Sequence, residues 1–197
     1  MSRQSAAFFL TLVLCGTTVQ AGVIDVTVSL DRSTIQVGET ATLTVMGQVQ
    51  PAYASAGNGI FGWDVDLRVA DPAVVEPLPA TLDRTGWTGN AMTSSSGVPT
   101  PWGLDAIYDT GEGSSSLGLE SPVRLFSVQF RGLSLGTTTL TIEADTVTGA
   151  DFVTWGGDVG GNYSQAWHSI TVTPEPATLA LVALGSLGAI VRRFRRT

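Results

Sequence analysis

The feature of this sequence that most restricts its fold is a strict alternation of apolar and polar residues between positions 60 and 70. The apolar positions are Phe61, Trp63, Val65, Leu67 and Val69. Asp64, Asp66 and Arg68 stand between them. Because successive side chains of a β-strand point to opposite faces, the pattern predicts a half-buried strand with its apolar face in a core.

Similar alternation recurs through residues 22–173, with turn residues at short intervals and no 3.6-residue period. Phe126–Arg131 alternates, Gly136 turns the chain, and Thr137–Ala144 alternates again, which predicts a β-hairpin. Further strands are predicted at Val26–Leu30 and around Ile170 and Val172. Roughly seven or more short strands without intervening helices favour an all-β sandwich.

The N-terminus has the pattern of a secretory signal peptide over residues 1–21. Arg3 provides the positive charge, Ala6–Cys15 the apolar stretch and Val19-Gln20-Ala21 a small-residue cleavage site. Reading Leu12–Cys15 as a lipoprotein box is the alternative, although Leu14 is large for the position before the cysteine. Cys15 is the sole cysteine, so removal of the leader leaves a chain that begins at Gly22 without any disulfide.

The C-terminus, residues 174–197, combines three features in order. Thr173-Pro174-Glu175-Pro176 is expected to be extended and exposed, because prolines disfavour regular helix and sheet. Ala177–Val191 is fifteen residues without a charge, and we expect a transmembrane helix there. As a helix it would be roughly 22 Å long, short of a hydrocarbon core of about 30 Å. The segment ends in a basic cluster formed by Arg192, Arg193, Arg195 and Arg196.

These residues resemble the PEP-CTERM protein-sorting signal of exopolysaccharide-producing Gram-negative bacteria. The resemblance rests on Pro174-Glu175-Pro176, the apolar segment and the terminal arginines, in that order. It implies recognition by an exosortase, a membrane-embedded cysteine transpeptidase that cuts near the Pro-Glu-Pro. The implied route is export, an anchored intermediate in the inner membrane, and then the cell surface, outer membrane or extracellular matrix. An ordinary tail anchor that follows a proline pair is the alternative.

Residues 22–173 resemble cohesin-like modules, the β-sandwiches that bind dockerins in cellulosomes. The resemblance rests on Gly59–Val75, with its aromatic strand and Asp-Pro turn, and on Leu125–Phe130 followed by Gly136–Ile142. The opening Val26–Val45 also fits, with Val37-Gly38-Glu39 at the position of the family's glycine-acidic turn. It implies a cohesin-like, jelly-roll β-sandwich. The Ser-, Gly- and Pro-rich stretch 88–121 departs from the family pattern, and no dockerin-contacting face aligns, so the resemblance predicts a fold better than a partner.

The charge of the predicted domain restricts its partners and cofactors. Residues 22–173 hold sixteen acidic residues and five arginines, a net charge of about −11, which makes nucleic acid an unsuitable partner. Asp145, Asp151 and Asp158, near the glycine-rich stretch 156–162, are candidate ligands for calcium. Their spacing matches no EF-hand or nonapeptide repeat, so a solvated acidic loop is the favoured alternative and no cofactor is expected.

The sequence contains few of the residues that commonly act in catalysis. His168 is the only histidine, no G-x-S-x-G motif occurs, and there is no lysine. A carboxylate pair for glycoside cleavage stays open, because it needs only two suitably spaced acids. We expect a protein that is not an enzyme.

Tryptophans supply the candidate binding residues. Trp87, Trp102 and Trp155 lie in Gly- or Ser-flanked segments, where indole rings can stack on sugars or act as lids over a sandwich end. Trp63 is expected in the core, with Trp167 as a second core candidate. The sequence thus predicts a structural or adhesive surface protein sorted by an exosortase. The alternative is a carbohydrate- or protein-binding module that recruits an exopolysaccharide or a surface protein.

Overall fold

The computed structural model describes residues 23–84, 93–110, 117–144, 152–158, 163–164 and 166–175. All regular structure in these residues is β-strand. The strands are β1 (Ile24–Leu30), β2 (Thr34–Gln36), β3 (Thr40–Val49), β4 (Ile60–Val69), β5 (Val75–Asp83), β6 (Thr93–Thr100), β7 (Gly103–Thr110), β8 (Val123–Gly132), β9 (Gly136–Ala144), β10 (Phe152–Thr154), β11 (Gly157–Asp158), β12 (Tyr163–Ser164) and β13 (Ala166–Thr173). The predicted all-β class is confirmed.

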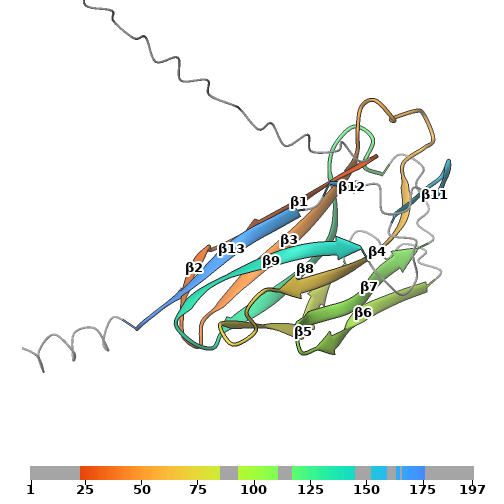
Figure 1. The fold of residues 1–197 in the computed structure, drawn as a ribbon. Coiled ribbons are helices and arrows are strands. Elements are labelled where there is room, and N and C mark those ends of the chain that lie inside the picture. Colours follow the sequence, from red (N-terminus) through yellow and green to blue (C-terminus); the bar gives the residue numbers. More distant parts are fainter. Residues whose placement is uncertain are drawn as a thin grey trace, which may run out of the picture.

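The strands form two sheets that pack face to face (Figure 1). The first sheet has the order β12-β1-β3-β8-β5. The second has the order β11-β10-β4-β9-β13-β2, and β7 pairs with β4 and carries β6. Most neighbours are antiparallel, but β2 runs parallel to β13, and β12 runs parallel to β1.

The core lies between the sheets and contains most of the apolar residues that alternation predicts, although Phe61 is only partly buried and Ile60 is buried instead. Trp63 of β4 and Phe126 of β8 are fully buried and stack on each other across the two sheets, with ring centroids 5.4 Å apart and planes 23° apart. Leu140 and Ile142 of β9 are also fully buried. The assignment of Trp63 to the core is therefore confirmed.

The polar face of β4 is more buried than alternation predicts. Asp64 and Asp66 are only 7% and 3% exposed, and Arg68 is the exposed residue of that face. The predicted strand and the burial of Trp63, Val65, Leu67 and Val69 are confirmed, but the exposure expected for Asp64 and Asp66 is wrong. The reason is that β4 has partners along both edges, and Tyr108 of β7 and Glu143 of β9 lie directly opposite the two aspartates.

The hairpin predicted between Phe126 and Ala144 is also wrong. β8 pairs with β3 and β5 in the first sheet, whereas β9 pairs with β4 and β13 in the second. The short connection at residues 133–135 crosses from one sheet to the other. Each strand has one strongly apolar face, and placing the strands in opposite sheets buries both faces against each other.

The strands that the sequence pattern missed include β5, β6 and β7, as well as the short strands β2, β10, β11 and β12. β5 contains Pro77 and Pro79 and lies at the edge of its sheet, where missing backbone N–H groups are tolerated. β6 and β7 form a hairpin within the Ser-, Gly- and Pro-rich stretch 88–121, whose sequence departs from the cohesin family pattern. Gly97 interrupts β6 with φ of 81°, a conformation that suits glycine.

Candidate functional site

The C-terminal motif predicted at residues 174–197 begins where the last strand ends. β13 lies between β9 and β2, and its residues 171–173 pair with residues 34–36 of β2. The Thr171 N–H donates to the Ser33 carbonyl at 2.8 Å, and the Thr173 hydroxyl donates to the Ile35 carbonyl at 3.2 Å. The folded domain therefore extends to Thr173.

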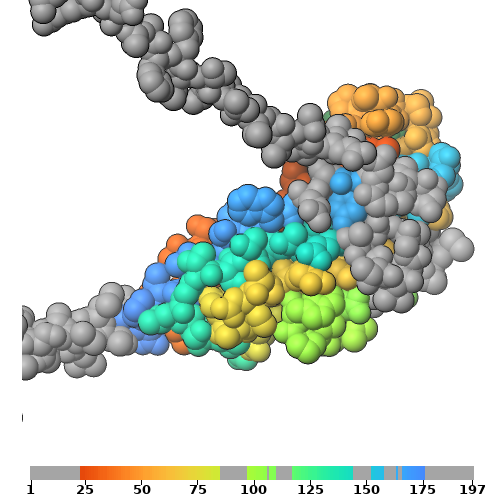
Figure 2. All heavy atoms as spheres, viewed as in Figure 1, coloured from red at the N-terminus to blue at the C-terminus, as the bar shows by residue number. Residues whose placement is uncertain are grey.

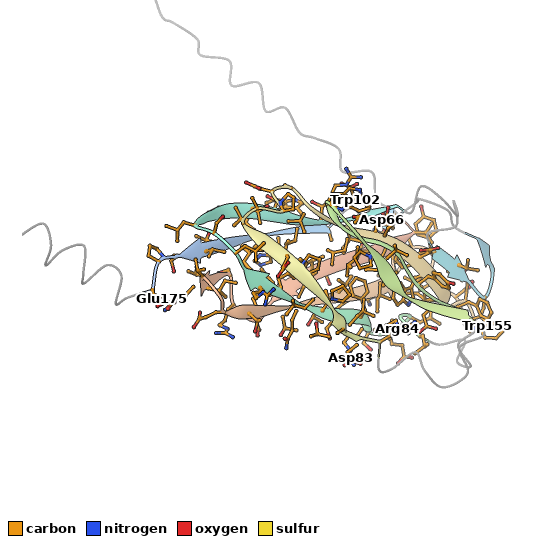
Figure 3. All side chains as sticks on the ribbon, turned by 90° about the horizontal axis from the view of Figure 1, so that it is seen from below. Asp66, Asp83, Arg84, Trp102, Trp155 and Glu175 are labelled. Atoms are coloured by element: carbon orange, nitrogen blue, oxygen red, sulfur yellow. The ribbon has the colours of Figure 1, made fainter. Side chains whose placement is uncertain are left out.

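Pro174 and Glu175 follow directly, without a linker. Pro174 has no N–H to continue the ladder, which explains why pairing stops there. Pro174 is half-buried, and Glu175 is exposed where the chain leaves one end of the sandwich (Figure 3). Pro176 and the arginines Arg192, Arg193, Arg195 and Arg196 lie outside the described residues, as do the predicted leader and apolar segment.

Trp102 lies against the outer face of the second sheet, in the turn between β6 and β7. The Arg68 guanidinium stacks over its ring, with Cζ 4.7 Å from the ring centroid. Arg68 Nε also donates to Glu143 at 2.8 Å, so the cation links the indole to a carboxylate on β9. The turn holds Trp102 close to β4, because the Val69 N–H donates to the Trp102 carbonyl at 2.7 Å.

Gly103 makes this close approach sterically feasible. It has φ of 152°, and a Cβ at this position would lie 1.9 Å from the Leu67 carbonyl oxygen. No side chain fits there, so the close backbone contact that seats Trp102 depends on glycine.

Trp155 lies at a different place, beside the start of β4. It is 46% exposed, contacts Phe61 edge to face at 4.9 Å, and donates its backbone N–H to Gly59. Trp102 is bonded to the other end of β4, and ten strand residues correspond to about 30 Å. The two indoles therefore do not form one surface (Figure 3). Trp87 lies outside the described residues.

Trp167 is not a core residue, contrary to the expectation. It is 66% exposed on β13 and lies opposite Thr141 of β9, which in turn lies opposite Arg68 of β4. The outer face of the second sheet therefore carries a cross-strand row: Trp167, Thr141, Arg68 and the stacked Trp102. Side chains of β13, β9 and β4 adjoin one another on this face (Figure 2). A signal for this position existed, because Trp167 is out of phase with the inward Ile170 and Val172.

The calcium and catalytic candidates receive no added support. Asp145 and Asp151 lie outside the described residues, and Asp158 belongs to β11, opposite Val153. Within the described part of the chain, no group of three or more His, Cys, Asp or Glu residues is placed to hold a metal ion. His168 is half-buried, and its Nδ1 lies 3.0 Å from the Ser169 carbonyl. The calcium site stays a prediction.

Comparison with solved structures identifies the domain as a cohesin-like β-sandwich. A type I cohesin in complex with a dockerin from Clostridium thermocellum superposes with a TM-score of 0.50 at 12% identity, covering 78% of this chain and 97% of that chain. A cohesin module from a family 33 glycoside hydrolase of Clostridium perfringens gives a TM-score of 0.50 at 11% identity, covering 79% and 100%. At these identities the likeness concerns the fold.

The C-terminal end matches the family model of the PEP-CTERM protein-sorting motif over residues 172–196. The chain therefore carries a PEP-CTERM motif joined to a cohesin-like domain, as the sequence predicted. No curated protein matches the chain. Among the described residues, no helix is long and apolar enough to cross a membrane.

Proposed function

We propose that this chain is an exported, non-catalytic surface protein whose C-terminal motif is processed by an exosortase. The observation that carries the proposal is the PEP-CTERM match at residues 172–196, which overlaps the last residues of β13. Glu175 is exposed at the end of the sandwich, where a membrane-embedded enzyme can reach it. In this proposal residues 1–21 are a leader, residues 177–191 a temporary transmembrane helix, and the arginines keep the tail inside.

The folded domain is compatible with both cuts. β1 starts at Ile24, so cleavage after Ala21 removes none of its residues. Cleavage at or beyond Pro174 leaves β13 and its pairing with β2 complete. The product would be an acidic, cysteine-free sandwich at the cell surface or in the extracellular matrix, with a structural or adhesive role beside exopolysaccharide.

Intact-mass analysis of the surface-exposed protein tests this proposal. We expect an N-terminus at Gly22 and a C-terminus near Pro174–Pro176 in cells that contain an exosortase, and an intact tail in cells that lack one. Glu175→Gln should slow tail removal, whereas Glu120→Gln, an equally conservative change at an exposed acid elsewhere, should not. Surface protein that still ends in Arg196 would refute the sorting role and leave a plain membrane anchor.

A second candidate function is ligand binding by the outer face of the second sheet. The row that contains Trp167, Thr141, Arg68 and Trp102 supports it, because indole rings beside hydroxyl and guanidinium groups suit a polysaccharide. The cohesin of similar fold is in complex with a dockerin, which is a protein. A protein is therefore the alternative class of ligand for this face. Among the residues predicted from sequence, Trp102 belongs to this face and Trp155 does not.

Isothermal titration of residues 22–173 with matrix polysaccharides tests this second function. Trp167→Ala and Trp102→Ala should weaken binding, and Trp155→Ala serves as the matched control on an indole that lies away from the face. If no polysaccharide binds, or if Trp155→Ala weakens binding as much as the other two, the sugar-binding face is wrong. Capture of a purified protein partner that Trp167→Ala abolishes would instead assign the face to a protein.

A further inference from the structure

Three exposed apolar side chains lie on loops at one end of the sandwich. Leu133 and Leu135 are 39% and 57% exposed in the connection between β8 and β9, and Val37 is 37% exposed in the turn between β2 and β3. Exposed leucines at consecutive odd positions of a short loop are unusual, because turns generally carry polar residues.

The loops that carry these side chains are fixed in place. The Leu133 N–H donates to the Val74 carbonyl at 2.8 Å, and the Ser134 hydroxyl donates to the Ala73 carbonyl at 2.7 Å. The Gly38 N–H donates to the Gly132 carbonyl at 2.8 Å, which joins the turn to the connection. Backbone hydrogen bonds therefore hold the two loops that carry Val37, Leu133 and Leu135 beside each other, and we call the surface formed by these three residues the apolar end.

The apolar end is also where the chain leaves the domain. Gln36 pairs with Thr173, and Gly136 pairs with Val172, so Val37 and Leu135 each adjoin a residue next to the exit of β13. Figure 1 shows the end of β13, β2 and the start of β9 at one end of the molecule. The loop between β3 and β4 lies at the other.

The length of chain beyond the domain brings this end to the membrane. Between Thr173 and the first residue of the apolar segment, Ala177, four residue steps span at most about 14 Å. The headgroup region on each side of a bilayer is itself roughly 5–8 Å thick. As a membrane-spanning helix the apolar segment would be short for the hydrocarbon core, and the bilayer would thin locally around it.

We propose that the apolar end rests on the membrane surface while the C-terminal segment is anchored, with Val37, Leu133 and Leu135 inserted among the lipid headgroups. The inference rests on the proposed anchored intermediate. The occupant of this surface is the lipid bilayer. The apolar faces of proteins bound at a membrane interface insert about 5–10 Å into the boundary between headgroups and acyl chains. Val37, Leu133 and Leu135 lie close enough to the anchored segment to insert in this way. The contact orients the sandwich with its long axis away from the membrane surface. It also holds the exposed Glu175 near the membrane surface, where a membrane-embedded enzyme can reach it.

The surface charge of the apolar end indicates which lipids it suits. Glu39 and Asp71 lie nearby, and both accept backbone hydrogen bonds, from Gln36 at 2.9 Å and Ala73 at 3.0 Å. Arg32, which donates to the Thr40 carbonyl at 2.8 Å, and Arg131, which pairs with Glu76, lie at the same end. Charges of both signs beside the leucines give the surface no preference for anionic headgroups. A zwitterionic phosphatidylcholine bilayer is therefore the suitable probe.

Depth-dependent fluorescence quenching on the full chain tests the contact. The chain is produced without an exosortase, so that it keeps its tail, and is reconstituted in phosphatidylcholine vesicles that carry acyl-chain nitroxides. Removal of the leader also removes Cys15, the only native cysteine, so an environment-sensitive fluorophore can be attached selectively at Leu135→Cys. The matched control is Tyr53→Cys, which is 47% exposed in the loop at the opposite end.

We expect the fluorophore at position 135 to shift to shorter wavelengths and to be quenched several-fold more than the one at position 53. In the first design the label itself could promote insertion, so a second design keeps the label constant. The fluorophore is attached at Val37→Cys, and the paired changes Leu133→Ser and Leu135→Ser should abolish its shift to shorter wavelengths.

Flotation of each sample with the vesicles separates the outcomes. Protein that floats, but whose labels at 135 and 53 are quenched equally, overturns the membrane contact and leaves anchoring and sorting intact. A shift at Val37→Cys that survives loss of both leucines overturns their role in the contact. Protein that does not float overturns the anchor, and with it both the contact and the proposed processing route.

Discussion

Replacing Arg84 should lower the free energy of unfolding far more than replacing Arg124, an arginine of a more exposed ion pair. Arg84 follows β5 in the first sheet, and its Nη1 lies 3.4 Å from Asp109 Oδ2 on β7 of the second sheet. The same nitrogen donates to the Tyr108 carbonyl at 3.1 Å. The side chain of Asp109 is 1% exposed and that of Arg84 is 17% exposed, so the ion pair links the two sheets in a largely dry environment.

The magnitude follows from the distance and the burial. At 3.4 Å and an effective dielectric constant near 20, the attraction is about 5 kcal/mol, offset by the cost of removing both charges from water. Arg84→Met removes the attraction but leaves the carboxylate buried, so we expect a loss of about 3–5 kcal/mol in the free energy of unfolding. Asp109→Asn removes the buried charge as well, and we expect a smaller loss of roughly 1–3 kcal/mol.

Urea unfolding of residues 22–173, followed by tryptophan fluorescence, measures these differences. The matched control is Arg124→Met. Arg124 pairs with Asp83 at a comparable 3.2 Å, but the two side chains are 35% and 45% exposed, so its loss should stay below about 1 kcal/mol. The double variant R84M/D109N should recover part of the stability that R84M loses. A loss for Arg84→Met no larger than that for Arg124→Met, or a larger loss for Asp109→Asn, would refute the argument.

Further predictions concern the backbone and the core, each checked by the same unfolding assay. Gly103→Ala should cost more than about 3 kcal/mol, because its Cβ would collide with the Leu67 carbonyl. Gly157→Ala, which also has positive φ but nothing within 4 Å, should lose only the roughly 1–2 kcal/mol of backbone strain; equal losses at the two glycines would contradict the clash. Phe126→Ala should cost about 3–5 kcal/mol, since it empties the stacked contact between the sheets. Leu135→Ala, at the exposed apolar end, should change stability by no more than about 0.5 kcal/mol; a larger loss would mean that Leu135 packs into the core.

Sequence reasoning succeeded for the candidate site where the signal is local. The PEP-CTERM motif was found because its three parts are contiguous in the chain, and the family model matches the same residues. The outer-face row was found only in part. The sequence identifies Trp102 as a candidate binding residue, but its alternation pattern places Arg68 on the polar face without a binding role and makes Trp167 a core candidate. Their relation is set by the pairing of β13 with β9 and of β9 with β4.

The sequence by itself determined the all-β class, the inward face of the principal strands and the order of the C-terminal motif. Alternation along a strand and composition at a terminus are properties of neighbouring residues, and they survive any arrangement of the sheets. The tertiary structure alone decided that β8 and β9 separate into opposite sheets, that Asp64 and Asp66 are buried, and that the apolar end surrounds the exit of β13. Each of these depends on pairing between residues far apart in the chain, which buries more apolar surface than the local hairpin would.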